Sequence, residues 1–508
     1  MLTRRGFLGV ALAGAAAGAA ASPLGAASAP FDLEEATFAG LRRRRSRELV
    51  DQYLARIRAL DPTLRAIIEI DPDAPAQADA RDREPPRGPL HGLPILLKDN
   101  VATADRTTTT AGSLALEGSI PPRDAELVAR LRAAGAVLLG KANMSEWANF
   151  RDRQSTSGWS ARGGQCRNPY ALDRTPSGSS SGSAVAVAAN LCAAAVGTET
   201  DGSITSPAAA CALVGVKPTV GLVSQSGIVP IAHSQDAAGP LARTVADAAA
   251  LLGVLAGETY ALDAGALKGA RLGVPRKGYT GYSREADAVL ETAIALMKER
   301  GAEIVDPAEI ATAGKWDDAE FDVLLYEINV DLPAYLAWAG APVRTIADIV
   351  AFNEKNADRE LVHFGQDILT AKPPSRARYD KARASALALA RKGGIDATMD
   401  KYRLDALVAP TQAPPSPIDL VNGDHWTGGA MGAAAVAGYP SVTVPAGWAY
   451  GLPIGLLFFG RARAEARLLN LAYAFEQARR ARRVPYLLAT AAERPGAEPA
   501  PRPAVPAP

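Results

Sequence analysis

The sequence predicts an α/β fold in one large domain. Short apolar runs bounded by glycine, proline or aspartate alternate with amphipathic helical stretches along most of the chain, the pattern of a sheet layered with helices. Alanine and glycine are abundant, and aromatic residues make up only 6% of the 508 residues, which suits close packing of helices on strands. No internal repeat and no clear linker divides the sequence.

The first half of the chain starts with a helical pattern over residues 31–60. The runs RAIIEI, GLPILL and AVLLGKAN then predict three strands, and RDAELVARLRAAG predicts a helix that leads into the third. Residues 149–183 are rich in glycine, serine, asparagine and arginine and show no periodicity; a loop of that length inside a compact domain is usually functional. After it, AVAVAANL predicts a helix and AAAVGTET a strand.

The second half continues the alternation. ARLGV and AEIVD predict strands, TVADAAALLGVLAG and READAVLETAIALMKERG predict helices, and residues 316–394 are mostly helical in pattern. LDALVAPT, YPSVTVPAG and PIGLLFFG predict late strands, and RAEARLLNLAYAFEQARR predicts a closing amphipathic helix. We expect specificity to be determined by the middle region, residues 251–410, where no motif is evident.

Composition excludes several classes of function. The net charge is +1 and charged residues make up 21%, so neither nucleic acid nor an acidic surface is an expected partner. The basic run Arg42–Arg45 lies in a helical pattern and is interpreted as a solvated helix face. The cysteines form no C-x-x-C pair or disulfide framework, and the four histidines form no H-x-x-x-H pair, so we expect neither a metal nor a cofactor.

The two ends of the chain predict processing and disorder. Twin arginines at Arg4 and Arg5 precede a weakly apolar, alanine-rich run and small residues, the pattern of a twin-arginine export signal over residues 1–29. We therefore expect a periplasmic or secreted protein with no stable membrane insertion after signal removal, since no other run has the ~18 apolar residues of a bilayer span. The domain would cover residues 30–490, and the Pro/Ala-rich residues 491–508 would be disordered.

One short motif suggests a serine esterase. Residues 178–182 read GSSSG and fit the G-x-S-x-G nucleophile elbow around Ser180. An elbow requires a buried strand directly before the serine, but the preceding CRNPYALDRTP contains two prolines and charged residues. The downstream histidines of a Ser-His-Asp triad stand in no distinctive context. The elbow interpretation is therefore the weaker one.

Three polar segments favour a different serine chemistry. Lys98 closes the buried strand-like GLPILLKDN, Ser179 lies in the serine-rich loop, and Ser203 lies in the polar GTETDGSITSPAA after an apolar strand. A serine hydroxyl becomes a good nucleophile only when a base removes its proton. A lysine can be that base when burial lowers its pKa and leaves it neutral.

Together these segments resemble the amidase signature family. Its pattern runs G-L-P-x-x-x-K-D, G-G-S-S-G-G-S, G-T-D-x-G-G-S-I-R-x-P-A and G-x-K-P-T, and the counterparts here are GLPILLKD, SGSSSGS, GTETDGSITSPA and GVKPT. The likeness covers residues 32–480 and is most pronounced towards bacterial peptide amidases, which remove the C-terminal amide of peptides. It implies an amidase-signature-type domain, with a mixed twisted β-sheet covered by helices on both faces.

The resemblance also implies roles for individual residues. Ser203 would be the nucleophile, Ser179 would follow a cis peptide bond and relay a proton, and Lys98 would be the base. The oxyanion hole would be formed by backbone N–H groups of Thr200, Asp201, Gly202 and Ser203, Ala148 and Ser179 would contact substrate, and Ser180 would be a supporting hydrogen-bonding residue.

Two positions depart from the family pattern. Asp201 stands where the first glycine of G-G-S is usual, a substitution that peptide-amidase-like members share. Thr205 stands where an arginine is usual, which argues against the subunit that supplies ammonia for transfer-RNA amidation.

The leading hypothesis is a cofactor-free serine amidase acting on peptide amides, working as a monomer or homodimer. The alternatives are an amidase for aryl acylamides or other small amides, an esterase using Ser180, and a periplasmic binding protein without chemistry.

Overall fold

The computed structural model describes residues 32–493. The predicted signal and most of the predicted tail lie outside this range; the first tail residues, Ala491–Glu493, form a short 3₁₀ turn. From Glu35 onward the described chain forms one compact unit. Within residues 32–493, no helix has both the length and the apolar character that crossing a bilayer requires.

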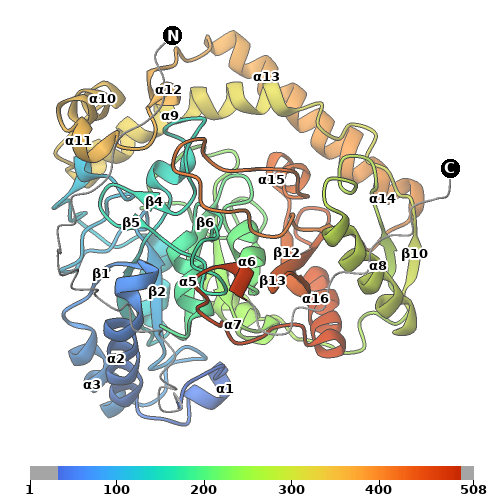
Figure 1. Cartoon of the computed structure of the whole chain (residues 1–508), viewed down its shortest axis with the longest axis horizontal. Coiled ribbons are helices and arrows are strands. Elements are labelled where there is room, and N and C mark those ends of the chain that lie inside the picture. The colour runs from blue at the N-terminus through green and yellow to red at the C-terminus, as the bar shows by residue number, and fades with distance from the viewer. Residues whose placement is uncertain (1–31, 494–508) are drawn as a thin grey trace, which may run out of the picture. The chain divides into compact units, whose positions relative to one another are not determined.

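A mixed sheet of eleven strands forms the centre of the described chain (Figure 1), in the order β1-β3-β2-β6-β8-β7-β12-β13-β11-β9-β10. The strands are β1 (Ile67–Ile70), β2 (Pro94–Lys98), β3 (Val137–Ala142), β6 (Ala194–Glu199), β7 (Val214–Lys217), β8 (Ala237–Ala242), β9 (Arg271–Gly273), β10 (Glu303–Val305), β11 (Ala406–Pro410), β12 (Ser441–Ala449) and β13 (Leu452–Phe459). Strand β2 runs parallel to both β3 and β6, whereas β6 and β8 are antiparallel. The predicted α/β fold with a mixed sheet is confirmed.

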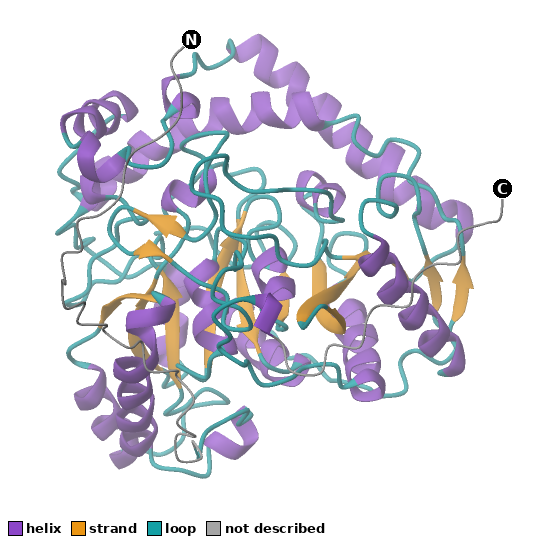
Figure 2. Cartoon of the chain, in the orientation of Figure 1, coloured by secondary structure: helices purple, strands orange, loops and turns teal. Residues whose placement is uncertain are grey.

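Helices flank this sheet (Figure 2). They are α1 (Phe38–Leu41), α2 (Ser46–Leu64), α3 (Ala74–Arg83), α4 (Glu126–Ala133), α5 (Ser181–Ala188), α6 (Thr205–Ala210), α7 (Val245–Ala256), α8 (Arg284–Glu299), α9 (Asp317–Ala339), α10 (Ile346–Lys355), α11 (Ala357–Glu360), α12 (Asp367–Thr370), α13 (Arg376–Ala390), α14 (Asp396–Tyr402), α15 (Gly432–Ala437) and α16 (Glu465–Arg479). Helix α5 packs on β2, β3, β6 and β8, α7 on β7 and β8, and α16 on β12 and β13. Helices α9 and α13 lie side by side in Figure 1.

The basic run near the N-terminus is not a helix face. Residues 42–45 form an exposed turn between α1 and α2. The carboxylate of Asp82 explains the break, because it accepts hydrogen bonds from the backbone N–H groups of Ser46 (2.6 Å) and Arg47 (3.1 Å). A carboxylate at that position satisfies the first free donors of a helix, so α2 begins at Ser46 and the predicted helix is split in two.

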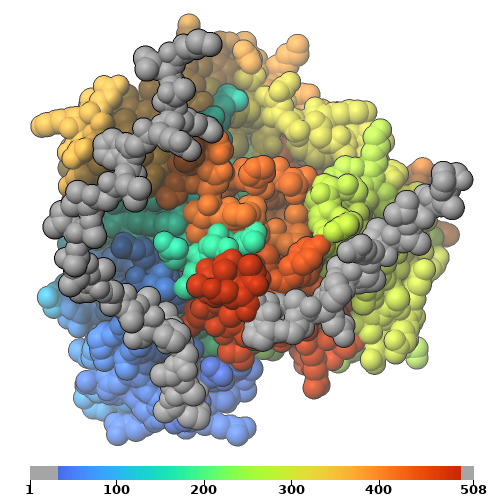
Figure 3. All heavy atoms as spheres, viewed as in Figure 1, coloured from blue at the N-terminus to red at the C-terminus, as the bar shows by residue number. Residues whose placement is uncertain are grey.

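The long segment without periodicity is mostly irregular but well anchored. It contains a small two-stranded ribbon of β4 (Trp159–Ser160) and β5 (Gly164–Gln165). Its residues around 170 lie beside the C-terminal end of the described chain, where Leu172 N–H donates to Leu488 O (2.8 Å) and Leu487 N–H to Pro169 O (2.9 Å). Figure 3 shows this meeting of teal-green and red atoms on one face of the molecule.

An apolar cluster places α9 next to the segment that follows β3. Leu324, Ile328 and Leu332 of α9 pack in one cluster with Trp147 and Phe150. All five side chains are buried, so this contact fixes the middle of α9 over residues 144–150. The middle region of the sequence thereby reaches the part of the fold where the conspicuous polar residues gather.

Candidate active site

Two parallel neighbouring strands bring the predicted base and nucleophile segments to one edge of the sheet. Strand β2 pairs with β6 through Ile95–Ala194 and Leu97–Val196. Lys98 is the last residue of β2, and residues 200–203 follow the end of β6. Carboxyl ends of adjacent parallel strands are a common place for ligand sites in open α/β sheets.

The serine-rich loop closes over this edge. The peptide bond between Gly178 and Ser179 is cis, as the resemblance implies. A Cβ at Gly178 would collide with Ser145 Oγ, so a side chain there would displace the serine hydroxyl that binds Gly158 N–H. Backbone hydrogen bonds hold both sides of the loop: Ser145 N–H donates to Ser179 O, and Ser180 N–H donates to Ser203 O, each at 3.1 Å.

Lys98 and Ser179 are in direct contact. Lys98 Nζ lies 2.7 Å from Ser179 Oγ, and both side chains are fully buried. Nζ also donates to Thr198 Oγ1 (2.9 Å) and Thr198 O (3.2 Å). A neutral amine has two N–H donors and one lone pair, so it can donate twice to Thr198 and accept from the Ser179 hydroxyl.

Burial makes the neutral form of Lys98 accessible near physiological pH. Desolvation lowers the pKa of Lys98 to about 7, against the opposing attraction of the Asp236 and Glu199 carboxylates. An amine that titrates near neutrality is matched to the work of a general base at the same pH.

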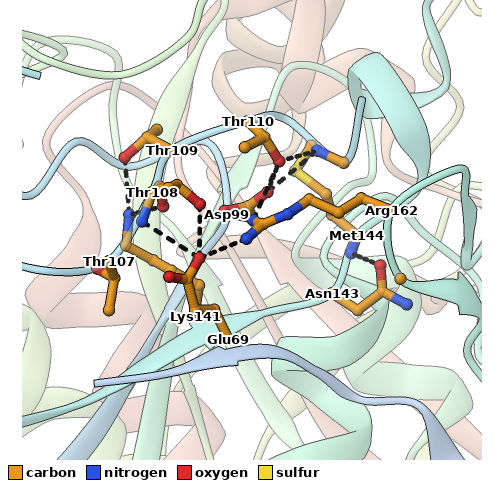
Figure 4. A network of polar contacts seen from close by, with 12 residues as sticks. Glu69, Asp99, Thr107, Thr108, Thr109, Thr110, Lys141, Asn143, Met144 and Arg162 are labelled. Carbon is orange, nitrogen blue, oxygen red and sulfur yellow. Dashed lines mark hydrogen bonds and ion pairs between the residues drawn. The ribbon is translucent and has the colours of Figure 1, made fainter. Parts of the chain in front are cut away.

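A second buried lysine shows why burial alone does not make a base (Figure 4). Lys141 in β3 donates to Thr109 Oγ1 (2.7 Å), Val101 O (2.9 Å) and Thr108 O (3.0 Å), so all three ammonium hydrogens are used. Burial lowers its pKa to about 8, while the Asp99 carboxylate favours its charged form. No serine hydroxyl is among these partners, and the network supports the strand end that carries Lys98 and Asp99.

Ser203 lies at the wall of a cavity of about 980 Å³. Within residues 32–493, the backbone N–H groups of Asp201, Gly202 and Ser203 have no hydrogen-bond partner, so they are free to bind an anion. In the same part of the chain, no hydrogen bond joins the hydroxyls of Ser179 and Ser203. Thr200 also lines this cavity, and its hydroxyl donates to Asp236 Oδ1 (2.6 Å).

Ser180 and Ser179 are both fully buried, and neither lines the cavity, so the structure does not place the predicted substrate-contacting Ser179 at its wall. Among the described residues, Ser179 is hydrogen-bonded to Lys98 and Ser180 is not. Ser180 Oγ donates to Thr198 O (3.0 Å) and accepts from Thr198 N–H (3.2 Å). No strand directly precedes it, so the local geometry lacks the strand-turn-helix unit of a nucleophile elbow.

Ala148 lines the cavity beside Ser203, in an unusual backbone conformation. Trp147, Ala148 and Asn149 have φ values of 48°, 57° and 67°, a run of left-handed residues without glycine. Such conformations cost free energy and persist where the surroundings hold them. Here the buried Trp147 side chain in the α9 cluster provides that hold.

The comparisons with known proteins agree with this geometry. A protein-family model described as Amidase matches residues 48–469. The structure is similar to the peptide amidase of Stenotrophomonas maltophilia, with 48% sequence identity, a TM-score of 0.86, and coverage of 90% of this chain and 100% of that one. A probable amidase of Arabidopsis thaliana is 40% identical, over 91% of this chain and 93% of its own length.

The chain belongs to the amidase signature family. The predicted family and enzyme class, an amidase-family hydrolase, are therefore confirmed. The chain is also similar to a glutamyl-tRNA(Gln) amidotransferase protein of Halorhodospira halophila, with 35% identity over 85% of this chain and 93% of that protein.

The departures from the family pattern have local structural explanations in this amidase. The carboxylate of Glu199 accepts from Ile204 N–H (2.8 Å), Thr205 N–H (2.8 Å) and Thr205 Oγ1 (3.0 Å), so a short, buried threonine fits at position 205. Asp201 lines the cavity, so the solvent that its side chain contacts lies inside the walls of the cavity. Desolvation and the charge of Glu199 raise the pKa of Asp201 to about 7, against the attraction of Lys217.

Sequence reasoning missed Thr198 and the far wall of the cavity. Thr198 binds the Lys98 amine, and its hydroxyl also accepts from Asn100 Nδ2 (3.0 Å). The signal available was Lys98 itself, because a buried amine requires nearby acceptors. The far wall comes from the loop before α9 and from the first turns of α9, including Trp316, Asp317 and Glu320.

One group in the described range has the composition of a metal site. His233, Glu327 and Asp331 place their ligand atoms within 4.8 Å of one another. These atoms already bond within the protein: His233 Nδ1 lies 2.8 Å from Asp331 Oδ2, and Glu327 accepts from Tyr379 Oη (2.7 Å). The group does not line the cavity beside Ser203, and we interpret it as a hydrogen-bonded link between the 231–236 loop and α9.

Proposed function

We propose that this chain is a serine amidase that hydrolyses the C-terminal amide of peptides to an acid and ammonia. The observation that carries the proposal is the fully buried Lys98–Ser179 contact at 2.7 Å, beside a cavity that Ser203 lines. The likeness to a peptide amidase along almost the whole chain supports the substrate class. A cavity of 980 Å³ is also larger than a simple amide requires.

Acylation would begin with the neutral amine of Lys98. The amine takes the Ser179 proton while Ser179 Oγ takes the Ser203 proton, and Ser203 Oγ bonds to the carbonyl carbon of the amide. The substrate has to draw the two serine hydroxyls together, and such contacts often tighten only in the substrate complex. The free N–H groups of Asp201, Gly202 and Ser203 would hold the oxyanion, each donor contributing about 3–4 kcal/mol.

Breakdown would reverse the relay. The proton passes from Lys98 through Ser179 to the amide nitrogen, the C–N bond breaks, and ammonia leaves an ester on Ser203. A water molecule then gives up a proton to the same relay, attacks the ester carbon and releases the peptide acid. The proton returns to Ser203 Oγ, so the cycle consumes one water for each amide bond.

Ammonia release from matched amides tests the substrate class. We expect kcat/KM to be at least about tenfold higher for N-acylated dipeptide amides than for anilides or acetamide, because a peptide fills more of the cavity. Ser203→Ala is the control for catalysis by contaminants. A preference for anilides or small amides would favour the alternative amidase. The absence of turnover together with a failure of a fluorophosphonate to label the folded protein would favour a binding protein.

We also propose that the protein is exported through the twin-arginine route. The support is the sequence around Arg4 and Arg5. The variant carrying Arg4→Lys and Arg5→Lys should retain amidase activity in the cytoplasmic fraction, whereas the parent chain should deliver it to the periplasm. Arg42→Lys with Arg43→Lys, in the exposed turn before α2, is the matched control. Equal periplasmic activity in all three would exclude this route.

A further inference from the structure

Part of the wall of the cavity that Ser203 lines is acidic. Asp201 lies in the loop after β6, while Asp317 is the first residue of α9 and Glu320 lies in its first turn. The three carboxylates repel one another. Desolvation and the charges of Asp201 and Asp317 raise the pKa of Glu320 well above its usual range. The charge of Asp317 also contributes to the raised pKa of Asp201. These carboxylates converge on one part of the cavity from two separate elements.

These carboxylates are short of partners. In the part of the chain that the structure describes, neither Asp201 nor Asp317 forms a hydrogen bond or ion pair, and Glu320 receives one hydrogen bond, from Gln235 Nε2 (2.8 Å). The other acidic side chains of the wall are satisfied; Glu309, for example, accepts from the backbone N–H of Arg276 and Lys277.

Basic groups of the cavity do not neutralise this cluster. Arg153 pairs with Asp367 (3.4 Å). Lys277 and Lys315 are exposed at the rim, and among the described residues neither lies within ion-pair distance of a carboxylate. The buried Lys217 attracts Asp201 but does not line the cavity, and among the described residues it forms no ion pair with these carboxylates. The repulsion within the cluster is one that a bound cation would relieve.

A nearby indole provides an independent indication of a ligand. Trp316 is only 4% exposed and lines the cavity, and no acceptor in residues 32–493 binds its Nε1–H. Trp316 Nε1 and Asp201 Oδ2 each lie 3.7 Å from the point that a Cβ on Gly432 would occupy. The rest of the Trp316 ring is buried, so its Nε1–H, which can only donate, is open to the cavity and to whatever binds there. A ligand at this point therefore offers a carbonyl oxygen to Trp316 and a cation to Asp201.

We propose that Asp201, Asp317 and Glu320 form a subsite for a cationic group on the acyl side of the amide, with Trp316 Nε1–H binding a carbonyl oxygen of the same substrate. The inference rests on the proposed amidase function and specifies its substrate class. Asp201 is two residues from Ser203, so the cation belongs to the residue that carries the amide or to the one before it. A lysine or arginine side chain and a free α-ammonium group share this chemistry.

Two pairs of matched substrates test the subsite and distinguish the two sources of charge. N-acetyl-lysine amide and N-acetyl-norleucine amide differ by the side-chain ammonium, and alanyl-alanine amide and its N-acetyl form differ by the α-ammonium. We expect kcat/KM to be about tenfold higher for the charged member of at least one pair, since a hydrogen bond to a charged group is worth about that factor. The pair that responds identifies the source of the cation.

Variants of the wall then assign the preference. Asp317→Asn and Glu320→Gln should each reduce the charged-to-neutral ratio, and the double variant should reduce it further while Asp201 remains. Asp318→Asn, which removes an exposed carboxylate on the same helix outside the cavity, should leave the ratio unchanged. Gly432→Ala places a methyl group at the converging point with ordinary 3.7 Å contacts, so it should fold normally and raise KM for the charged substrates.

The outcomes separate the two proposals. If ammonia is released from none of the amides, both the subsite and the amidase function fall. If the neutral amides are hydrolysed as well as the charged ones, the amidase function stands and the subsite is overturned. A charged-to-neutral ratio that is as large in the Asp317→Asn and Glu320→Gln variants as in the parent chain would also overturn the assignment to these residues.

Discussion

Ser203→Ala should lower kcat for peptide amide hydrolysis by at least about 10⁴-fold, because its hydroxyl lines the cavity beside free backbone N–H groups that can hold an oxyanion, whereas the neighbouring Thr200 hydroxyl is bonded to Asp236. Ammonia release under single-turnover conditions measures the loss. Mass spectrometry after treatment with a fluorophosphonate should place the adduct on Ser203 in the parent chain and find none in the variant.

Ser180→Ala is the matched control, since it removes one hydroxyl from the neighbouring loop. Within residues 32–493, Ser180 Oγ bonds only to the backbone of Thr198, so we expect a smaller loss, about tenfold, through less precise placement of β6. The opposite pattern, with Ser180→Ala inactive and Ser203→Ala active, would restore the esterase interpretation of GSSSG and remove Ser203 as the nucleophile.

The second large effect concerns pH. The parent enzyme should gain activity as pH rises through about 7, because the pKa of Lys98 lies there and only the neutral amine accepts a proton. Lys98→Ala should be slower at every pH and should lose this acid limb, and its deficit should be larger at neutral than at high pH, where hydroxide replaces the base. Profiles of kcat/KM against pH for both proteins provide the measurement.

The dependence of kcat/KM on pH needs controls for two other buried or titrating groups, Asp201 and Lys141. Asp201 also titrates at about 7, so the acid limb is assigned to Lys98 only if Lys98→Ala abolishes it. Lys141→Met removes another buried lysine, whose amine bonds to Val101, Thr108 and Thr109. Its profile should keep the acid limb even if the protein melts at a lower temperature. A flat profile for parent and Lys98→Ala alike, from mildly acid to alkaline pH, would exclude the relay.

The strands that the sequence predicted contain apolar, β-branched residues. The strands that it did not predict, β7 and β8, lack a clear pattern because they contain small residues. Strand β8 reads AAGPLA, and its Gly239 lies so close to β7 that a Cβ would come within 2.0 Å of Val216 O. Strand β7 has only four residues, and a Cβ on its Gly215 would lie 2.7 Å from Ala208 Cβ. Close backbone approach selects small residues, which carry no strand signal.

The same contrast holds at the site. Lys98, Ser179 and Ser203 could be predicted because they lie in dense motifs, and the structure brings all three to one sheet edge. Thr198 and Trp316 could not, because their contacts depend on how distant segments pack and on the shape of the cavity rather than on spacing along the chain. The specificity role of residues 251–410 stays a prediction, and the proposed acidic subsite in the first turn of α9 is one way to test it.

The pairing of β2 with β6 also determines at which stage of folding the active site can form. Ser179 and Thr198 come 81 and 100 positions after Lys98, so the amine meets its partners only after a long loop of chain has closed. An incomplete or partly unfolded chain holds the three groups apart and has no means of lowering the pKa of the lysine. We therefore expect hydrolytic activity only once the sheet is complete, and a fragment that lacks either strand should be inactive.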